Sequence, residues 1–374
     1  QGHVDAQYFL AECYANGDGC DKNPKQAAIW YEKAAEQKHI SAQYKIGMCY
    51  KNGDGVEVDL EKAAKWLLIA AERGDIYAQY DLGDCYATGS GVDKDDTEAI
   101  SWFRKSAEQD NPLAQYELGR RYAAGAGVDH DPVKSFNWFK KAAEHKYFDQ
   151  AQYLVGLSYE LGAGVEKDAA QAVNWYQKAA DNGHAEAQDS LGYCYQSGDG
   201  VATDLAQAVA WYRKSAEQGN ASAQNNLAHC YLEGIGIDKD PVEGSAWYRK
   251  SAEQGNKEAQ FNLGVCYAKG EGVEKDYPQS LEWVRKAAAQ GLSIAHAHIG
   301  TRYRDGEGVL QDDQQACVHY LIAGALGQPN TSLFVDKLRE ERLSAEQYKD
   351  AKSMANEWIE KFRKDDSVAT LPED

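Results

Sequence analysis

The sequence contains no long apolar run and no excess of positive charge. No segment approaches the roughly 18 apolar residues of a membrane span, so a transmembrane helix is not expected. Lys and Arg total 40 against 59 Asp and Glu, which gives a formal net charge of −19. Because nucleic acids and anionic membrane surfaces both bind basic surfaces, neither is an expected partner.

The common catalytic motifs are also missing. The sequence contains no phosphate-binding P-loop, no His–Glu–x–x–His, no Gly–x–Ser–x–Gly and no Ser–x–x–Lys. Three Gly–Asp–Gly turns, at 17–19, 53–55 and 198–200, lack the further carboxylates and the distal Glu of a calcium loop. We interpret them as turns, which favour Gly and Asp, and predict a protein that is not an enzyme and holds no cofactor.

What the sequence does contain is a repeat. The stretch AEAQDSLGYCYQSGDGVATDLAQAVAWYRKSAEQGN, residues 185–220, is 36 residues long, and its pattern recurs before and after it. An alanine, followed by Gln in eight copies and by His296 in the ninth, marks each copy: Ala6, Ala42, Ala78, Ala114, Ala151, Ala187, Ala223, Ala259 and Ala295. One interval contains an extra residue, near Tyr147. Self-similarity at this period indicates a solenoid.

Each copy predicts a pair of helices. Counted from Ala187, apolar or small residues fall at offsets 0, 4, 5 and 8, which is one helical face. Gly192, at offset 5, would cost about 1 kcal/mol within a helix, so its recurrence predicts close packing by another helix. Gly198 and Gly200 should end the first helix, and Asp204 should N-cap the second. Neither helix can bury its apolar face alone, so the copies should stack.

Six of the eight cysteines share offset 7, which argues against a disulfide framework. Equivalent positions of packed helices lie about 8–10 Å apart, whereas a disulfide needs Cα atoms within about 7 Å. We expect thiols at the edge of the core, which favours a reducing compartment such as the cytoplasm. The six are Cys13, Cys49, Cys85, Cys194, Cys230 and Cys266.

Copies four, five and nine depart from the pattern. Copy four has Arg120–Arg121 and copy five has Leu157–Ser158 at offsets 6 and 7. In copy nine, His319 replaces a Trp of the second helix that the other eight copies keep and that we expect to be buried. The only metal-like cluster is here: His296, His298, Cys317 and His319. Because His296 and His298 point about 200° apart on a helix, we favour a divergent terminal repeat over a metal site.

The two ends of the chain lie outside the regular pattern. Gln1–Gly2 matches the middle of a copy, so we expect residues to precede Gln1. The period is lost after Gly327. One helix is predicted from Asn330 to about Glu341, and a capping box at Ser344 and Gln347 opens another, to about Lys364. We therefore divide the chain into a solenoid, 1–327, a C-terminal cap, 328–364, and an acidic tail, 365–374.

These motifs resemble the Sel1-like repeat family, which is close to the tetratricopeptide repeats. The matching residues are Leu191–Gly192–x–x–Tyr195, Gly198–x–Gly200–Val201, Asp204 and Ala208–x–x–Trp211–Tyr212–x–Lys214–x–Ala216. The resemblance covers about 1–327. It implies an all-α, right-handed superhelical solenoid of antiparallel helix pairs, with the first helices on the concave side, and a non-catalytic scaffold that assembles proteins. It leaves the cytoplasm, the cell envelope and secretion all open.

Two positions of the first helix are candidates for partner binding. Offset 2 is aromatic in six copies, although such rings could also pack on a neighbouring repeat, and offset 6 varies freely, as a surface contacted by a partner would. We predict a groove for an extended protein segment or for an acidic or C-terminal group, with carbohydrate or cell-wall binding as the alternative. The predicted groove residues are Tyr8, Tyr44, Met48, Tyr80, Asp84, Tyr116, Arg120, Tyr153, Leu157, Tyr193, His229, Phe261 and Val265.

Overall fold

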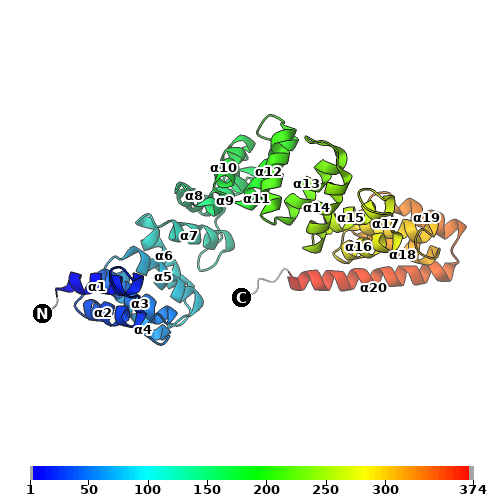
Figure 1. The fold of residues 1–374 in the computed structure, drawn as a ribbon. Coiled ribbons are helices and arrows are strands. Elements are labelled where there is room, and N and C mark those ends of the chain that lie inside the picture. The colour runs from blue at the N-terminus through cyan, green and yellow to red at the C-terminus, as the bar shows by residue number, and fades with distance from the viewer. Residues whose placement is uncertain (1–2, 370–374) are drawn as a thin grey trace. The chain divides into compact units, whose positions relative to one another are not determined.

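The computed structural model describes residues 3–369, and side chains over residues 3–364; this part of the chain is helical throughout, with no strand (Figure 1). It divides into two compact units, Gln1–His184 and Ala185–Asp374. In each unit a first and a second helix alternate. The first helices are α1 (Val4–Asn16), α3 (Ile40–Asn52), α5 (Ile76–Thr88), α7 (Pro112–Ala124), α9 (Asp149–Leu161), α11 (Ala185–Ser197), α13 (Ala221–Glu233), α15 (Lys257–Lys269) and α17 (Ser293–Asp305). The second helices are α2 (Pro24–Glu36), α4 (Leu60–Glu72), α6 (Asp96–Glu108), α8 (Pro132–Ala143), α10 (Ala169–Asp181), α12 (Leu205–Glu217), α14 (Pro241–Glu253), α16 (Tyr277–Ala289) and α18 (Asp313–Ala325).

Helix ends follow the predicted signals. Gly53 ends α3 in the left-handed conformation, with φ of 80°, which glycine adopts without a steric penalty. Asp59 then N-caps α4, its carboxylate accepting a hydrogen bond of 3.0 Å from the backbone N–H of Lys62. The aspartates or asparagine at this position accept such a bond in all nine copies: Asn23, Asp59, Asp95, Asp131, Asp168, Asp204, Asp240, Asp276 and Asp312.

The glycine of the first helix packs closely against the second helix, as predicted; it meets an aromatic ring in most of the copies that have it, but Leu67 at Gly47 and Val284 at Gly264. A Cβ added to Gly83 would come within 2.8 Å of the Phe103 ring, and one on Gly192 within 2.7 Å of the Tyr212 ring. Both distances are too short for a side chain, so the glycine allows the two helices of a pair to approach. In the turn, the second glycine packs between copies, since a Cβ on Gly164 would overlap the carbonyl of Pro132.

A buried glutamine accounts for the Ala–Gln signature. In copy seven, Gln224 donates a hydrogen bond of 3.1 Å from Nε2 to the carbonyl of Ala216, at the end of the preceding helix. Its Oε1 accepts one of 2.7 Å from Nε2 of Gln254, at the end of its own second helix. Gln79 has the same pair of partners in Ala71 and Gln109. We call this arrangement the glutamine relay; it satisfies a buried side chain and ties three helices together.

Tryptophan and cysteine occupy the positions expected for packing residues. Trp102, Trp175 and Trp211 are 7–8% exposed, and a lysine three residues later covers each ring, with Nζ 3.5–3.7 Å from the ring centroid. The remaining five repeat tryptophans are half-buried. All eight cysteines are free thiols; six are buried and Cys13 is half-buried, all of them within first or second helices, while Cys20 lies between two helices. Burial raises the pKa of the Cys49 thiol to about 11, so it stays protonated at neutral pH.

The second unit ends in two further helices, α19 (Thr331–Glu341) and α20 (Ala345–Ala369). The predicted capping box is present: Gln347 N–H donates to Ser344 Oγ over 3.1 Å, and Ser344 N–H to Gln347 Oε1 over 2.9 Å. Helix α20 packs along α18, and its Ala351 and Ala355 are buried there. It continues beyond the predicted end, through Ala369; the remainder of the expected tail, 370–374, lies outside the described residues.

Candidate functional site

The tyrosines at offset 2 are half-buried, and each contacts its own helix pair. The ring centroids of Tyr80 and Phe103 lie 5.6 Å apart, and those of Tyr116 and Phe139 lie 5.7 Å apart. Tyr153 stacks on His184 at 4.8 Å. Burial, followed by the carboxylates of Glu117 and Asp84, raises the pKa of Tyr80 above its ordinary value, so its phenol stays neutral. Tyr8, Tyr44 and Phe261 are half-buried in the same way. This row therefore contributes packing and leaves only part of each ring accessible.

The residues at offset 6 are more accessible and fall into two groups. Arg120, Tyr193 and His229 are exposed, with Tyr193 60% accessible. Met48, Asp84, Leu157 and Val265 are half-buried. Asp84 is paired with Nζ of Lys51 at 3.2 Å. We define the first-helix face as the residues at offsets 2, 3 and 6 of the first helices, and describe it in each unit separately.

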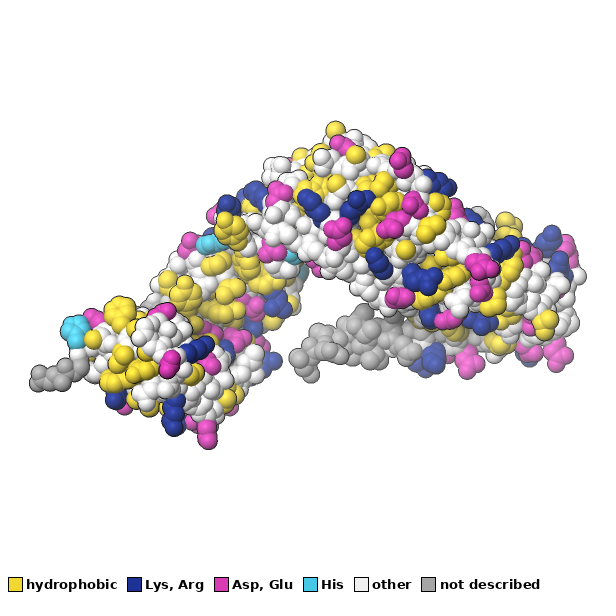
Figure 2. Space-filling view, in the orientation of Figure 1, with side chains coloured by type: hydrophobic (Ala, Val, Ile, Leu, Met, Phe, Trp, Pro, Cys, Tyr) yellow, Lys and Arg dark blue, Asp and Glu magenta, His cyan; other side chains and the backbone are white. Residues whose placement is uncertain are grey.

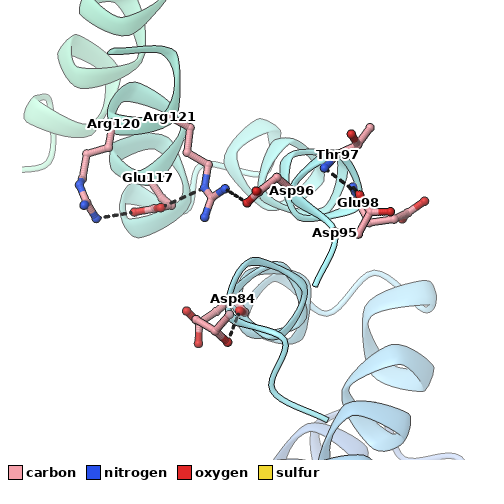
Figure 3. Close-up of polar contacts among 9 residues, drawn as sticks. Asp84, Asp95, Asp96, Thr97, Glu98, Glu117, Arg120 and Arg121 are labelled. Carbon is pink, nitrogen blue, oxygen red and sulfur yellow. Dashed lines mark hydrogen bonds and ion pairs between the residues drawn. The ribbon is translucent and has the colours of Figure 1, made fainter. Parts of the chain in front are cut away.

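The two arginines of copy four are ion-paired (Figure 3). Arg120 Nη1 lies 3.1 Å from Glu117 Oε2, and its side chain is 60% exposed. Arg121 is 12% exposed, and its guanidinium joins Glu117, at 3.1 Å, to Asp96, at 2.8 Å. Glu117 thus accepts from both arginines. The local positive charge is largely neutralised, and only Arg120 presents part of its guanidinium to solvent.

An open hollow of about 550 Å³ adjoins these arginines. Its lining combines the aromatic rings of Tyr116 and Phe139, the aliphatic side chain of Leu154 and the polar groups of Arg120 and Gln150. An aromatic and aliphatic floor with a cation at its edge is the composition of an interface centre rather than of a catalytic cleft. The structure therefore brings together Tyr116 and Arg120, two of the predicted groove residues.

Sequence reasoning missed the next position, offset 3, which is repeatedly polar. Lys45 pairs with Glu12 at 3.3 Å, Asp81 with Lys51 at 3.2 Å, and Glu117 with both arginines. In the second unit this position holds Asn226 and Asn262. The sequence shows a polar residue at offset 3 in seven of nine copies, but the ion pairs that these residues form could be seen only in the structure.

The histidines of copy nine form a pair, not a metal cluster. His296 and His319 lie with their Nδ1 atoms 3.1 Å apart, while His296 Nε2 contacts the carbonyl of Ala288, as the replaced glutamine would. His298 lies elsewhere, against the ring of Phe261. Burial lowers the pKa of His296 to about 4 and that of His319 to about 3. Within residues 3–364, no group of three or more His, Cys, Asp or Glu side chains is arranged to hold a metal ion.

Comparison with known families assigns the repeat. Nine segments match the family model of the Sel1 repeat: 4–39, 40–75, 76–111, 112–147, 149–184, 185–220, 221–256, 257–292 and 293–328. The chain belongs to the Sel1 repeat family. Each Sel1 repeat is one helix pair, and residue 148, between two matches, lies beside the insertion predicted near Tyr147. Sel1 repeat proteins are typically protein-interaction scaffolds and are generally non-catalytic.

Solved structures support the assignment. The chain is similar to a protective antigen of uropathogenic Escherichia coli strains with an SLR fold, at 34% identity and a TM-score of 0.70, over 100% of this chain and 88% of the other. It is also similar to a Sel1 repeat protein of Oxalobacter formigenes, at 31% identity and a TM-score of 0.62, over 80% and 87%. A search of curated proteins gives no match. None of the described helices combines the length and apolar character of a membrane span.

Proposed function

We propose that this Sel1 repeat chain is a non-catalytic scaffold that binds a protein partner on its first-helix face, with Tyr116 and Arg120 at the centre of the contact in the first unit. The observation that carries the proposal is the hollow of about 550 Å³, where an exposed Arg120 borders aromatic and aliphatic side chains. Aromatic residues and arginine dominate the energetic centres of protein interfaces. The exposed part of the Arg120 guanidinium would donate hydrogen bonds to a carboxylate of the partner, from an acidic side chain or a C-terminus.

The geometry favours a protein over the alternative ligand, carbohydrate. Sugar rings stack on open aromatic faces, whereas the rings of Tyr80, Tyr116 and Tyr153 each contact an aromatic residue of their own second helix. The surface shown in Figure 2 has acidic and basic side chains interspersed among apolar ones. Such a mixed surface suits a protein partner with complementary charges.

The test is capture of partners from cell lysate by the full chain, read by mass spectrometry. Arg120→Glu reverses the exposed charge without touching the core, and should abolish capture. Tyr116→Ala with Arg120→Ala should do the same, but it also removes ring contacts with Phe139 and Phe148 at 5.7 and 5.3 Å, so its melting midpoint needs to be compared.

The matched control is Tyr147→Ala with Lys134→Ala. It removes one tyrosine and one cation from the same copy, both exposed and outside the hollow. Capture should persist in this control. Unimpaired capture by folded Arg120→Glu would exclude the hollow and move the contact to another surface.

A further inference from the structure

A hydrogen-bonded chain of asparagines crosses the first-helix face of the second unit. Asn262 on α15 donates from Nδ2 to Oδ1 of Asn225 on α13 over 3.2 Å. Asn225 donates to its neighbour Asn226 over 3.4 Å, and Asn226 donates to Oδ1 of Asp189 on α11 over 3.0 Å. The side chains of three successive first helices are therefore linked in one direction. We call these four residues the amide row.

The amide row retains hydrogen-bonding capacity. A carboxamide has two N–H donors and an oxygen with two lone pairs, and each of the three asparagines uses one donor here. Asn262 Oδ1 accepts no bond within the described residues. The three asparagines are half-buried, not enclosed, so the remaining groups can reach a ligand. The bonds within the row also hold the amides in place, which reduces the entropy lost on binding.

The residues beside the row define the rest of the surface. Tyr193 and His229 are exposed, and they lie one helical turn beyond Asp189 and Asn225 on the same helix faces. Val265 is the equivalent residue of α15, three residues after Asn262, and is half-buried. Burial raises the pKa of Asp189 to about 6, and no Lys or Arg stands among these residues. The surface is thus suited to neutral polar groups and unsuited to phosphates or carboxylates.

We infer that the amide row binds the main chain of an extended polypeptide segment of the partner, which rests on the scaffold function proposed above. A peptide unit carries one donor and one acceptor, and this matches the paired capacity of each asparagine. The carboxamides of Asn225 and Asn262 are in direct hydrogen-bond contact, at 3.2 Å, and successive residues of a polyproline-II segment rise about 3.1 Å. The three carboxamides, two in one repeat and one in the next, therefore meet peptide groups one or two residues apart along a single segment. Tyr193 and His229 contact the side chains between.

The experiment uses the full wild-type chain and a displayed library of unstructured 12-residue peptides. Selected peptides are resynthesised with an N-methyl group at one backbone nitrogen at a time, and binding is measured by titration. Methylation removes a donor and leaves the side chains intact. Affinity should fall about tenfold or more at two or more backbone positions that lie within about two residues of one another. A loss below about twofold at every position, or no selected peptide, would overturn the inference.

Substitutions in the amide row test whether its asparagines bind the selected peptides. Asn225→Leu with Asn262→Leu keeps the side-chain size while removing two of the three amides, and should weaken binding of the selected peptides about tenfold or more. Asn174→Leu is the control, since Asn174 is an exposed asparagine on the second helix α10 of the other unit. Circular dichroism checks folding. Binding of a glycan array that is lost in the same double variant would overturn the peptide assignment in favour of carbohydrate.

Failure of this inference is distinguishable from failure of the proposed function. Arg120→Glu tests capture through the first unit, and the N-methyl scan tests main-chain recognition by the second. Loss of capture in Arg120→Glu with no N-methyl effect would leave the scaffold standing and remove only the amide row.

Discussion

Copy four and copy seven follow the same pattern, but only copy seven completes its glutamine relay. Gln224 of copy seven has both a carbonyl acceptor and a glutamine donor. Gln115 of copy four donates to the carbonyl of Ala107 over 3.3 Å and to Asp110, yet its buried Oε1 has no partner among the described residues. His145 stands where Gln254 stands in copy seven, and it contacts Asp110 instead.

The difference accompanies two local changes: His145 replaces the donor glutamine, and one residue is inserted after it. Helix α8 has 12 residues where the other second helices have 13, and the chain then turns through the exposed Tyr147. His145, at the donor position, lies against Asp110 and leaves Gln115 Oε1 without a donor among the described residues. A solenoid copy thus tolerates both changes, at the cost of one buried hydrogen bond.

Replacing the repeat tryptophan should give the largest difference in stability between two copies. Trp175 in copy five is 8% exposed and lies under Lys178, whereas Trp138 in copy four is half-buried. Trp175→Ala should lower the free energy of unfolding by about 3–5 kcal/mol, as expected for a buried aromatic side chain, and Trp138→Ala by less. Urea unfolding followed by circular dichroism measures both. A loss below about 1 kcal/mol for Trp175 would show that it does not pack between helices.

Copy nine, where His296 replaces the relay glutamine, should make stability depend on pH. The folded protein keeps His296 and His319 neutral because burial lowers their pKa values to about 4 and about 3, while the unfolded chain takes up protons near pH 6.5. Stability is therefore complete above about pH 6.5 and falls as the pH drops towards 4.

At pH 5 the expected loss is about 2 kcal/mol for each imidazole, relative to pH 7.5. His296→Gln with His319→Trp restores the residues of the regular copies and should remove most of the pH dependence between pH 7.5 and 5, leaving the contribution of His298, whose pKa burial also lowers to about 4. Thermal melting across this range decides the matter, and an unchanged slope in the double variant would place the titrating groups elsewhere.

Replacing the relay glutamine should cost more in copy seven than in copy four. Gln224→Leu leaves the Ala216 carbonyl and the Gln254 amide without partners, so we expect a loss of about 2 kcal/mol. In Gln115→Leu the lost oxygen had no partner in the folded protein, so the free energy of unfolding should fall by about 1 kcal/mol or less. Equal shifts of the urea midpoint would mean that the missing bond in copy four has no energetic consequence.

The smallest effect is expected from repairing copy four. Deleting Tyr147 and changing His145→Gln restores the 36-residue spacing and offers Gln115 Oε1 a donor. The gain should be about 0.5–1.5 kcal/mol, the value of one intramolecular hydrogen bond. His145→Gln alone is the control, since the turn would still displace the amide. A deletion that destabilises the protein would show that the longer turn is the better fit.

Most of the fold was predictable from the sequence because each helix signal is local and repeats. The Asp or Asn N-cap, the glycine turn and the glycine of the first helix all act within one copy or on its neighbour, and repetition removed the ambiguity of single motifs. The Sel1 resemblance is confirmed by nine matched repeats. In the sequence, the relay glutamine is visible only as the repeated Ala–Gln pair. Its hydrogen-bond donor lies 30 residues later, as Gln254 does for Gln224, so the pairing could be seen only in the structure.

The candidate site was less predictable because accessibility depends on neighbouring copies. Offset 2 and offset 6 lie on one helical face, yet Tyr116 is held between two phenylalanines while Arg120 is exposed. The pairing of Arg121 with Asp96, 25 residues earlier, likewise depends on how two helix pairs stack. The binding role of these residues stays a prediction.

The glutamine relay also bears on how such a chain can lengthen during evolution. Each relay involves a copy and the end of the copy before it, so duplicating one whole copy recreates every bond at both new junctions. A duplication of any other length would misplace the donor, whereas the single extra residue near Tyr147 leaves the relay of Gln152 bonded on both sides. Repeats should therefore be gained and lost in steps of 36 codons, and occasional single-codon insertions should be found in the turns.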